Sequence, residues 1–171
     1  MKRINYQQGI LAVIAIALLA FTTVSCDNIS RKRACKHWSR AVTHQFPNTN
    51  WAFEEEVLEF PFDIEDTSQS YDVSVVLLYD TGVVELKDIP LVLTLIAPDG
   101  MQSISSSHFL LDEKTNPDIK ITDNKAEASV VVYPKRKFKV PGTHNLSVYR
   151  RAEKADNYGF ISLTAKVAVA K

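Results

Sequence analysis

A two-residue alternation of apolar and polar side chains, repeated along residues 58–170, is the feature that most constrains the fold. Its clearest instance is residues 160–170, where Ile161, Leu163 and Val167 lie on one face of an extended chain. Successive side chains of a β-strand point to opposite faces, so this period buries one face of each strand. The pattern predicts strands at residues 58–65, 71–79, 90–97, 128–133, 144–149 and 160–170.

Turn residues separate these segments at short intervals. Pro98-Asp99-Gly100 and Pro141-Gly142 are strong turn signals, and Pro61 confines its strand to a sheet edge or a bulge. Residues 83–86 are a weaker strand candidate, and residues 101–111 fit either an edge strand or a long loop. About seven to eight short strands with turns every eight to twelve residues predict an all-β fold, an antiparallel β-sandwich.

The first 26 residues have the layout of a bacterial export signal that ends in a cysteine. Lys2 and Arg3 precede an unbroken apolar block at residues 10–21, which small and polar residues connect to Cys26. In a helix this block would span only about 18 Å, whereas the hydrocarbon core of a bilayer is about 30 Å thick. The block is therefore too short for a stable membrane anchor, and we expect residues 1–25 to be cleaved.

Lipidation of Cys26 is the first interpretation of this junction. Cleavage after Ser25 would leave a cysteine whose thiol carries diacylglycerol, and acyl chains such as palmitate would then hold the protein at a membrane. The alternative is an ordinary secretory signal cleaved nearby, which leaves Cys26 as a plain thiol. If Cys26 is acylated, Cys35 is the remaining cysteine, so no internal disulfide can form and stability has to come from packing.

Residues 26–50 are expected to form a partly helical tether in front of a globular domain at residues 51–171. Read as a helix, residues 27–45 place Ala34, Trp38 and Val42 on an apolar stripe beside a basic face. On one interpretation the basic face contacts anionic lipid head groups, and on the other it is simply solvated. The face begins with Arg31, Lys32 and Arg33.

The charge balance argues against a nucleic-acid partner. The chain has 20 basic and 20 acidic side chains, and loss of Lys2 and Arg3 with the leader leaves a formal charge of about −2. Two basic loops, which a sandwich could place at one end, are candidates for contact with lipid phosphates, anionic glycan or an acidic protein surface, although such clusters also serve solubility. They contain Lys135, Arg136 and Lys137 in a connection at residues 134–137, and Arg150 and Arg151.

No recognised catalytic motif occurs in the sequence. A nucleophile elbow, a Walker loop, paired zinc ligands and a paired-carboxylate signature are all missing, so we expect neither an enzyme nor a bound metal or cofactor. Five aromatic residues allow a carbohydrate-binding platform as an alternative function, although their spacing suits core positions equally well. These residues are Trp51, Tyr71, Tyr79, Tyr149 and Tyr158.

A series of short motifs has an order and spacing that extend over a large part of the mature chain. The motifs are Trp51, Phe60-Pro61-Phe62-Asp63-Ile64, Asp66-Thr67, Tyr71, Pro98-Asp99-Gly100, Phe138 with Gly142, Arg150, and Gly159-Phe160-Ile161. Together they resemble the GldH family of gliding-motility lipoproteins of Bacteroidetes. The sequence departs from the family pattern at residues 77–79, where an arginine is usual, and at residues 116–125, which replace a glycine-rich middle.

The resemblance implies a non-catalytic lipoprotein of the cell envelope, held in the outer membrane and facing the periplasm. It also implies a role in surface gliding and the linked type IX secretion machinery, through contacts with other envelope proteins. A carbohydrate-binding lipoprotein is the alternative function. The resemblance assigns structural positions to Trp51, Tyr71, Pro98, Gly100, Gly142 and Gly159.

Overall fold

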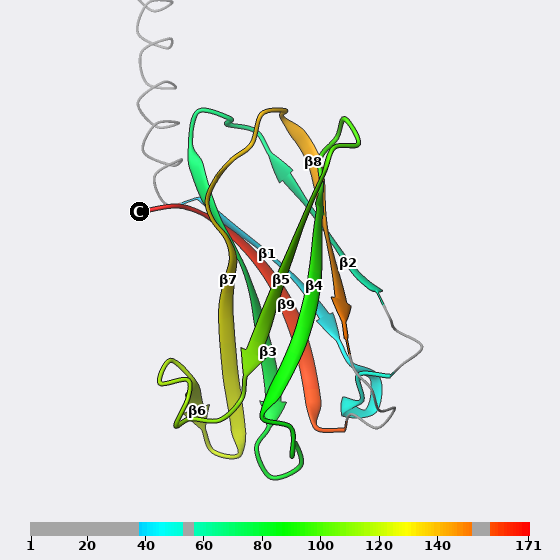
Figure 1. Cartoon of the computed structure of the whole chain (residues 1–171), viewed down its shortest axis with the longest axis vertical. Helices are drawn as coiled ribbons and strands as arrows, with labels where there is room; N and C mark the ends of the chain where they lie inside the picture. The colour runs from blue at the N-terminus through cyan, green and yellow to red at the C-terminus, as the bar shows by residue number, and fades with distance from the viewer. Residues whose placement is uncertain (1–37, 53–56, 152–157) are drawn as a thin grey trace, which may run out of the picture. The chain divides into compact units, whose positions relative to one another are not determined.

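The structure, a computed structural model, describes residues 38–52, 57–151 and 158–171. Within the compact unit Ser39–Lys171, two antiparallel sheets pack face to face as a β-sandwich (Figure 1). The predicted fold class is confirmed, with nine strands in the described residues instead of seven or eight. The strands are β1 (Ser39–Gln45), β2 (Val57–Ile64), β3 (Ser70–Asp80), β4 (Asp88–Ile96), β5 (Gln102–Leu110), β6 (Lys120–Thr122), β7 (Lys125–Lys137), β8 (Gly142–Arg150) and β9 (Phe160–Val169).

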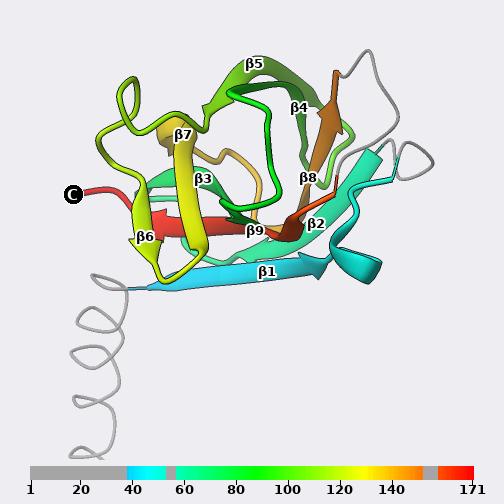
Figure 2. The same ribbon diagram turned by 90° about the horizontal axis from the view of Figure 1, so that it is seen from below.

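One sheet has the strand order β1-β9-β3-β7-β6, and the other has the order β2-β8-β4-β5. Figure 2 shows the two layers from one end, with β4 and β5 on one side and β1 and β9 on the other. Pro61 lies on the edge strand β2, as predicted, where proline is tolerated because an edge strand pairs on one side only. Of the two alternatives for residues 101–111, the edge strand is correct, because β5 pairs with β4 alone in its sheet.

The core lies between the sheets and follows the predicted alternation. Along β3 and β4 every second residue is buried, and the same period continues on β2 and β8. Burial of one such aliphatic or aromatic side chain contributes about 1.5–3 kcal/mol, so the inner faces supply most of the stabilising free energy. The largest fully buried side chains are those of Trp51, Phe60, Ile64, Leu77, Ile89, Leu91, Leu93, Phe109, His144, Leu146, Phe160 and Leu163.

Strand β1 corrects the prediction of a helical tether. Residues 39–45 are extended and pair with β9, where Val42 lies opposite Ala165 and His44 opposite Leu163. Pairing with β9 gives these residues a ladder of backbone hydrogen bonds. This pairing stabilises the extended conformation more than the narrow apolar stripe would stabilise a helix. The globular domain therefore begins at residue 39 and not at residue 51, while residues 26–37 lie outside the described part.

Two further sequence expectations are wrong. Residues 83–86 form a turn and an irregular segment instead of a strand. Residues 134–137, expected to be a loop, are the last residues of β7. The pairing of β7 with β3 shifts register at two places just before this segment. Lys135 adopts a φ of 47°, and its backbone N–H donates a hydrogen bond of 2.8 Å to the Asp72 carboxylate. A capped bulge of this kind lets a long strand keep its partner.

Gly142 and Gly159 occupy positions that other residues fit poorly. Gly142 has a φ of 121°, and a Cβ there would lie 3.3 Å from Cγ of Pro98, so these residues pack two turns together. Gly159 has a φ of 91°, and a Cβ there would lie only 2.8 Å from Cγ2 of Val84. Its carbonyl accepts a 2.7 Å hydrogen bond from the N–H of Asp80.

We predict that Gly159→Ala lowers the free energy of unfolding by about 2–4 kcal/mol, through positive-φ strain and the collision with Val84. Gly82→Ala is the matched control, because Gly82 has no positive φ and a Cβ there approaches only the side chain of Asp80. Its effect should not exceed about 1 kcal/mol in either direction. Urea denaturation of both variants measures the difference, and equal losses would contradict the assignment.

Candidate functional site

The two basic clusters predicted from the sequence lie at opposite ends of the sandwich. Lys137 ends β7, and the short connection 138–141 leads directly into the first residue of β8, so these residues share one end. Arg150 is the last residue of β8 and therefore lies at the other end, beside Leu91. The expectation that one surface unites both clusters is wrong, because a full strand separates them.

Arg150 is a core residue and not a surface contact. Its side chain is 6% exposed, one Nη donates to the carbonyl oxygen of Trp51 at 3.1 Å, and its guanidinium carbon lies 5.1 Å from the centre of the Trp51 ring. Burial lowers the pKa of the guanidinium from its usual value, but arginine still carries its charge at neutral pH. Arg150 therefore holds Trp51, which follows β1 in the chain, against the end of β8.

Removal of the contact between Arg150 and Trp51 should destabilise the fold. We predict that Arg150→Ala lowers the free energy of unfolding by about 2–4 kcal/mol, because the Trp51 carbonyl loses its charged donor and the ring loses its cation. The neighbouring Arg151 is exposed, so Arg151→Ala should change stability by no more than about 0.5 kcal/mol. Chemical denaturation followed by Trp fluorescence tests the pair, and similar losses would show that Arg150 is not special.

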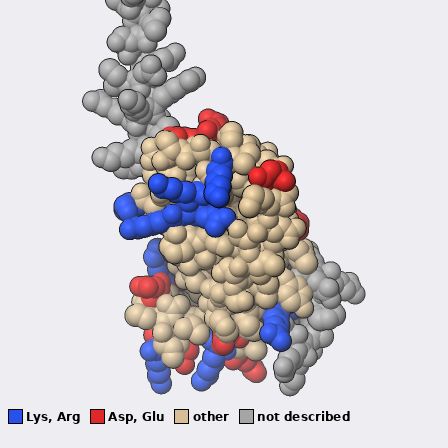
Figure 3. All heavy atoms as spheres, turned by 45° about the horizontal axis from the view of Figure 1, so that its top comes forward, with Lys and Arg blue, Asp and Glu red and all other residues tan. Residues whose placement is uncertain are grey.

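Four cations gather at the end where β7 finishes, and we call this cluster the basic end. Its residues are Lys135, Arg136, Lys137 and Lys139. In Figure 3, which brings this end forward, lysine and arginine side chains gather beside a broad area without charge. This much of the predicted basic surface is present, and Lys139, which the sequence analysis did not single out, belongs to it.

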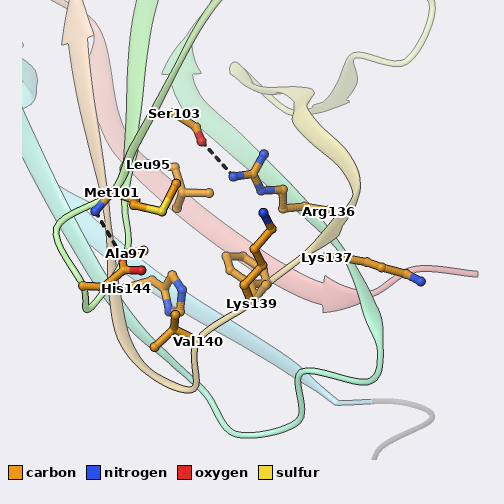
Figure 4. A pocket seen from close by; sticks show the side chains of 11 residues that line it. Leu95, Ala97, Met101, Ser103, Arg136, Lys137, Lys139, Val140 and His144 are labelled. Atoms are coloured by element: carbon orange, nitrogen blue, oxygen red, sulfur yellow. Dashed lines mark hydrogen bonds between the residues drawn. The ribbon is translucent and has the colours of Figure 1, made fainter.

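A pocket of about 210 Å³ opens between the two sheets at the basic end (Figure 4). Arg136 lies opposite the buried Tyr71 in the ladder, so its side chain is on the inner face of its sheet. Ser103 lies opposite the buried Leu95 and is on the inner face of the other sheet. Arg136 donates from Nη2 to Oγ of Ser103 at 2.7 Å, which joins the two sheets across the pocket. The lining residues are Leu95, Ala97, Asp99, Met101, Ser103, Arg136, Lys137, Phe138, Lys139, Val140 and His144.

His144 forms part of the wall of this pocket and is 2% exposed. Its ring stacks on Phe62 at 5.9 Å and meets Phe138 edge-on at 4.6 Å, while Nδ1 lies 3.1 Å from the carbonyl oxygen of Gly142. Burial lowers the pKa of the imidazole, and Arg136 acts in the same direction, against opposing effects of the Gly142 carbonyl and of Asp99. His144 is therefore neutral at pH 7, which leaves arginine and lysine as the cations of the pocket.

This shift predicts a loss of stability in acid. Since the folded state lowers the pKa of His144, the unfolded chain protonates first as the pH falls through about 6.5, and the free energy of unfolding falls with it. His144→Phe keeps a ring between Phe62 and Phe138 and removes the titration. Urea denaturation at pH 7.5 and pH 5 should show a smaller loss for the variant than for the wild type, and identical losses would contradict the assignment.

Three central rows on the outer face of the four-stranded sheet carry little charge, whereas Asp63 and the Asp88–His108 pair lie toward the margins of the same face. We call these rows the low-charge face, and cross-strand pairing sets their order. Glu59 is the charged residue of these rows, and its carboxylate accepts hydrogen bonds from Asn145 and from Oγ of Ser147. The rows are Val57, Tyr149, Val92 and Ser106; Glu59, Ser147, Thr94 and Ile104; and Pro61, Asn145, Ile96 and Gln102.

Several apolar side chains on this face are open to solvent. Ile104 is 71% exposed, Val57 is 51% exposed and Tyr149 is 38% exposed. The outer face of the other sheet differs, because Asp72, Lys166, Glu127 and Lys120 are spread over its strands. The two outward surfaces of the sandwich therefore have different chemistry, and the low-charge face is the one suited to contact with another surface.

The aromatic residues do not form the sugar platform allowed by the sequence. Trp51, Tyr71 and Tyr79 are all at least 97% buried, and the hydroxyl of Tyr71 donates to the carbonyl of Asp66 at 2.7 Å. Tyr149 and Tyr158 are exposed, and of these Tyr149 belongs to the low-charge face. Most of the proposed platform is thus core, as the alternative interpretation of its spacing predicted.

Cys26, Arg31, Lys32 and Arg33 lie outside the described residues, so their predicted roles rest on the sequence. Across residues 38–52, 57–151 and 158–171, no group of three or more His, Cys, Asp or Glu side chains is arranged to hold a metal ion. The same part of the chain contains no helix of the length and apolarity that a membrane crossing requires.

Comparisons with known proteins give only remote structural likenesses. No family model matches the chain, and no curated protein matches its sequence. Dimeric latent PorU from Porphyromonas gingivalis has 9% identity and a TM-score of 0.38, covering 79% of this chain and 13% of that chain. A carbohydrate-binding module specific for non-crystalline cellulose has 12% identity and a TM-score of 0.41, covering 76% and 73%. The infectious bursal disease virus Gx strain has 14% identity and a TM-score of 0.40, covering 79% and 33%. Values this low carry no argument about function.

Proposed function

We propose that this protein is a non-catalytic lipoprotein, anchored through Cys26 in the outer membrane on its periplasmic face, that works by binding another envelope protein. The low-charge face carries this proposal. Interface centres are depleted of charged residues and enriched in aromatic ones, and the rows around Tyr149 have that composition. The GldH-like motifs support gliding and type IX secretion as the process in which the contact takes place.

The size of the face limits what it can do alone. With strands about 4.8 Å apart and same-face neighbours about 6.8 Å apart, the rows cover roughly 300–400 Å². A stable interface buries about 800 Å² on each partner, so a protein bound here must also contact strand edges or loops around the face. The free backbone edge of β5, which pairs with β4 alone in its sheet, borders the face and can extend the contact.

The partner contact can be tested by placing a charge in the face. Thr94→Lys puts an ammonium group in its middle row, where a bound partner would have to bury an added charge. Ser129→Lys adds the same charge to an exposed position of the other sheet and serves as the control. After extraction of the envelope with detergent, Thr94→Lys should retain about a tenth or less of the protein that co-purifies with the wild type. Wild-type recovery by both variants would contradict the proposed surface.

The anchor has its own test. Mass spectrometry of the natural protein should find an amino-terminal Cys26 that carries acyl chains, and Cys26→Ser should move the protein from the membrane fraction to the soluble fraction. An unmodified amino terminus would contradict the anchor without bearing on the low-charge face.

A second candidate is a carbohydrate-binding lipoprotein, which one observation favours. Tyr149 presents an exposed ring one row away from the hydroxyl groups of Ser147 and Thr94, and such a mixture can bind a sugar by stacking and hydrogen bonds. Affinity electrophoresis in gels that contain envelope polysaccharide separates the candidates. Retardation that Tyr149→Ala abolishes would favour glycan, whereas equal mobility would favour a protein partner.

A further inference from the structure

The cations of the basic end have no anionic partner in the described residues. Within the part of the chain that the structure describes, no carboxylate forms an ion pair with any of the four side chains, which are those of Lys135, Arg136, Lys137 and Lys139. Asp99 is the acidic residue of the pocket, and its carboxylate accepts a hydrogen bond from the N–H of Met101 at 3.1 Å. The pocket therefore combines an excess of positive charge with a concave wall, which concentrates anions.

Arg136 is held in place before any ligand arrives. One Nη donates to Ser103, the guanidinium carbon lies 5.9 Å from the centre of the Tyr133 ring, and Nε is buried without an acceptor. A cation fixed in this way loses little side-chain entropy on binding, and its other Nη is available to donate to an oxyanion. Figure 4 shows Arg136 and Lys139 directed into the pocket from different segments, while Lys137 points away from it.

We propose that this pocket binds a single phosphate group. At about 210 Å³ it is smaller than the 300 Å³ or so at which drug-sized ligand sites begin, so it fits one compact group. A phosphate carries a charge of about −1.5 to −2 and offers acceptors in several directions, which suits an arginine and a lysine that approach from different sides. Leu95, Met101 and Phe138 form an apolar wall on which the carbon chain of a phosphate ester can lie.

The position of the pocket favours a lipid head group as the source of the phosphate, a step that rests on the proposed anchor. Ser39, where the domain begins, pairs with Ala168, and Val169 pairs with Tyr71, which itself pairs with Arg136. The chain from Cys26 therefore enters at the end that holds the pocket. The 12 residues between Cys26 and Ser39 reach at most about 47 Å, which limits how far this end can lie from the bilayer surface.

The test uses the full-length protein purified in a neutral maltoside detergent, with isothermal titration calorimetry against two probes. Inorganic phosphate represents the free source, and dihexanoyl phosphatidic acid represents the head group. We expect saturable binding of at least one probe with a dissociation constant of about 1 mM or tighter. Lys139→Glu should weaken it about tenfold or more, since it replaces a charged donor with a repelling group. Arg136→Lys, which keeps the charge but loses the fork, should weaken it less.

Lys125→Glu is the matched control, because Lys125 is an exposed lysine at the opposite end of the same strand. Equal affinity for both probes would assign the site to free phosphate, and tighter binding of the lipid by about tenfold or more would assign it to a head group. Either result supports the site. Failure of both probes to saturate, or equal weakening by Lys139→Glu and Lys125→Glu, would overturn it. Because the protein is in detergent, binding of either probe does not depend on acylation of Cys26, which mass spectrometry examines separately.

Discussion

The structure depends on one constraint, which is that the two sheets must cover each other's inner faces completely. Both cysteines, Cys26 and Cys35, lie outside the described residues, so no disulfide links the two sheets there, and the packing of alternating aliphatic and aromatic residues carries the stability. Even Arg150, a charged side chain, lies in this core, because Trp51 supplies both a carbonyl acceptor and a ring for it. Most inward positions are thereby committed to packing, and the outer faces, the edges and the ends, including the pocket at the basic end, remain for binding.

These remaining surfaces differ in chemistry, and the differences suggest separate uses. The outer face of the five-stranded sheet is charged in the ordinary way, whereas the low-charge face exposes Val57, Tyr149 and Ile104. The basic end opens a pocket between the sheets, and Ser39, the first residue of β1, lies at the same end.

The sequence predicted those features that depend on local periodicity and missed those that depend on distant partners. Alternation alone located β3, β4 and β9, and proline placed β2 at an edge. Strand β1 was mistaken for helix because its apolar spacing fits both periods, and only pairing with β9 decides between them. Arg150 looked like a surface cation because Trp51, its partner, lies 99 residues away. The outward residues Val92, Thr94 and Ile96 hinted at a low-charge surface, but the neighbours that complete it follow from cross-strand register.

Contact through the low-charge face is the central claim, and site-specific photo-crosslinking in the living source cells tests it most directly. Benzoylphenylalanine placed at Val92 lies within the face, and the same probe at Ser129 lies on the outer face of the other sheet. The account predicts that irradiation joins the Val92 probe to one defined envelope protein and leaves the Ser129 probe without that product. A crosslink to this protein from Ser129 but none from Val92 would contradict the account.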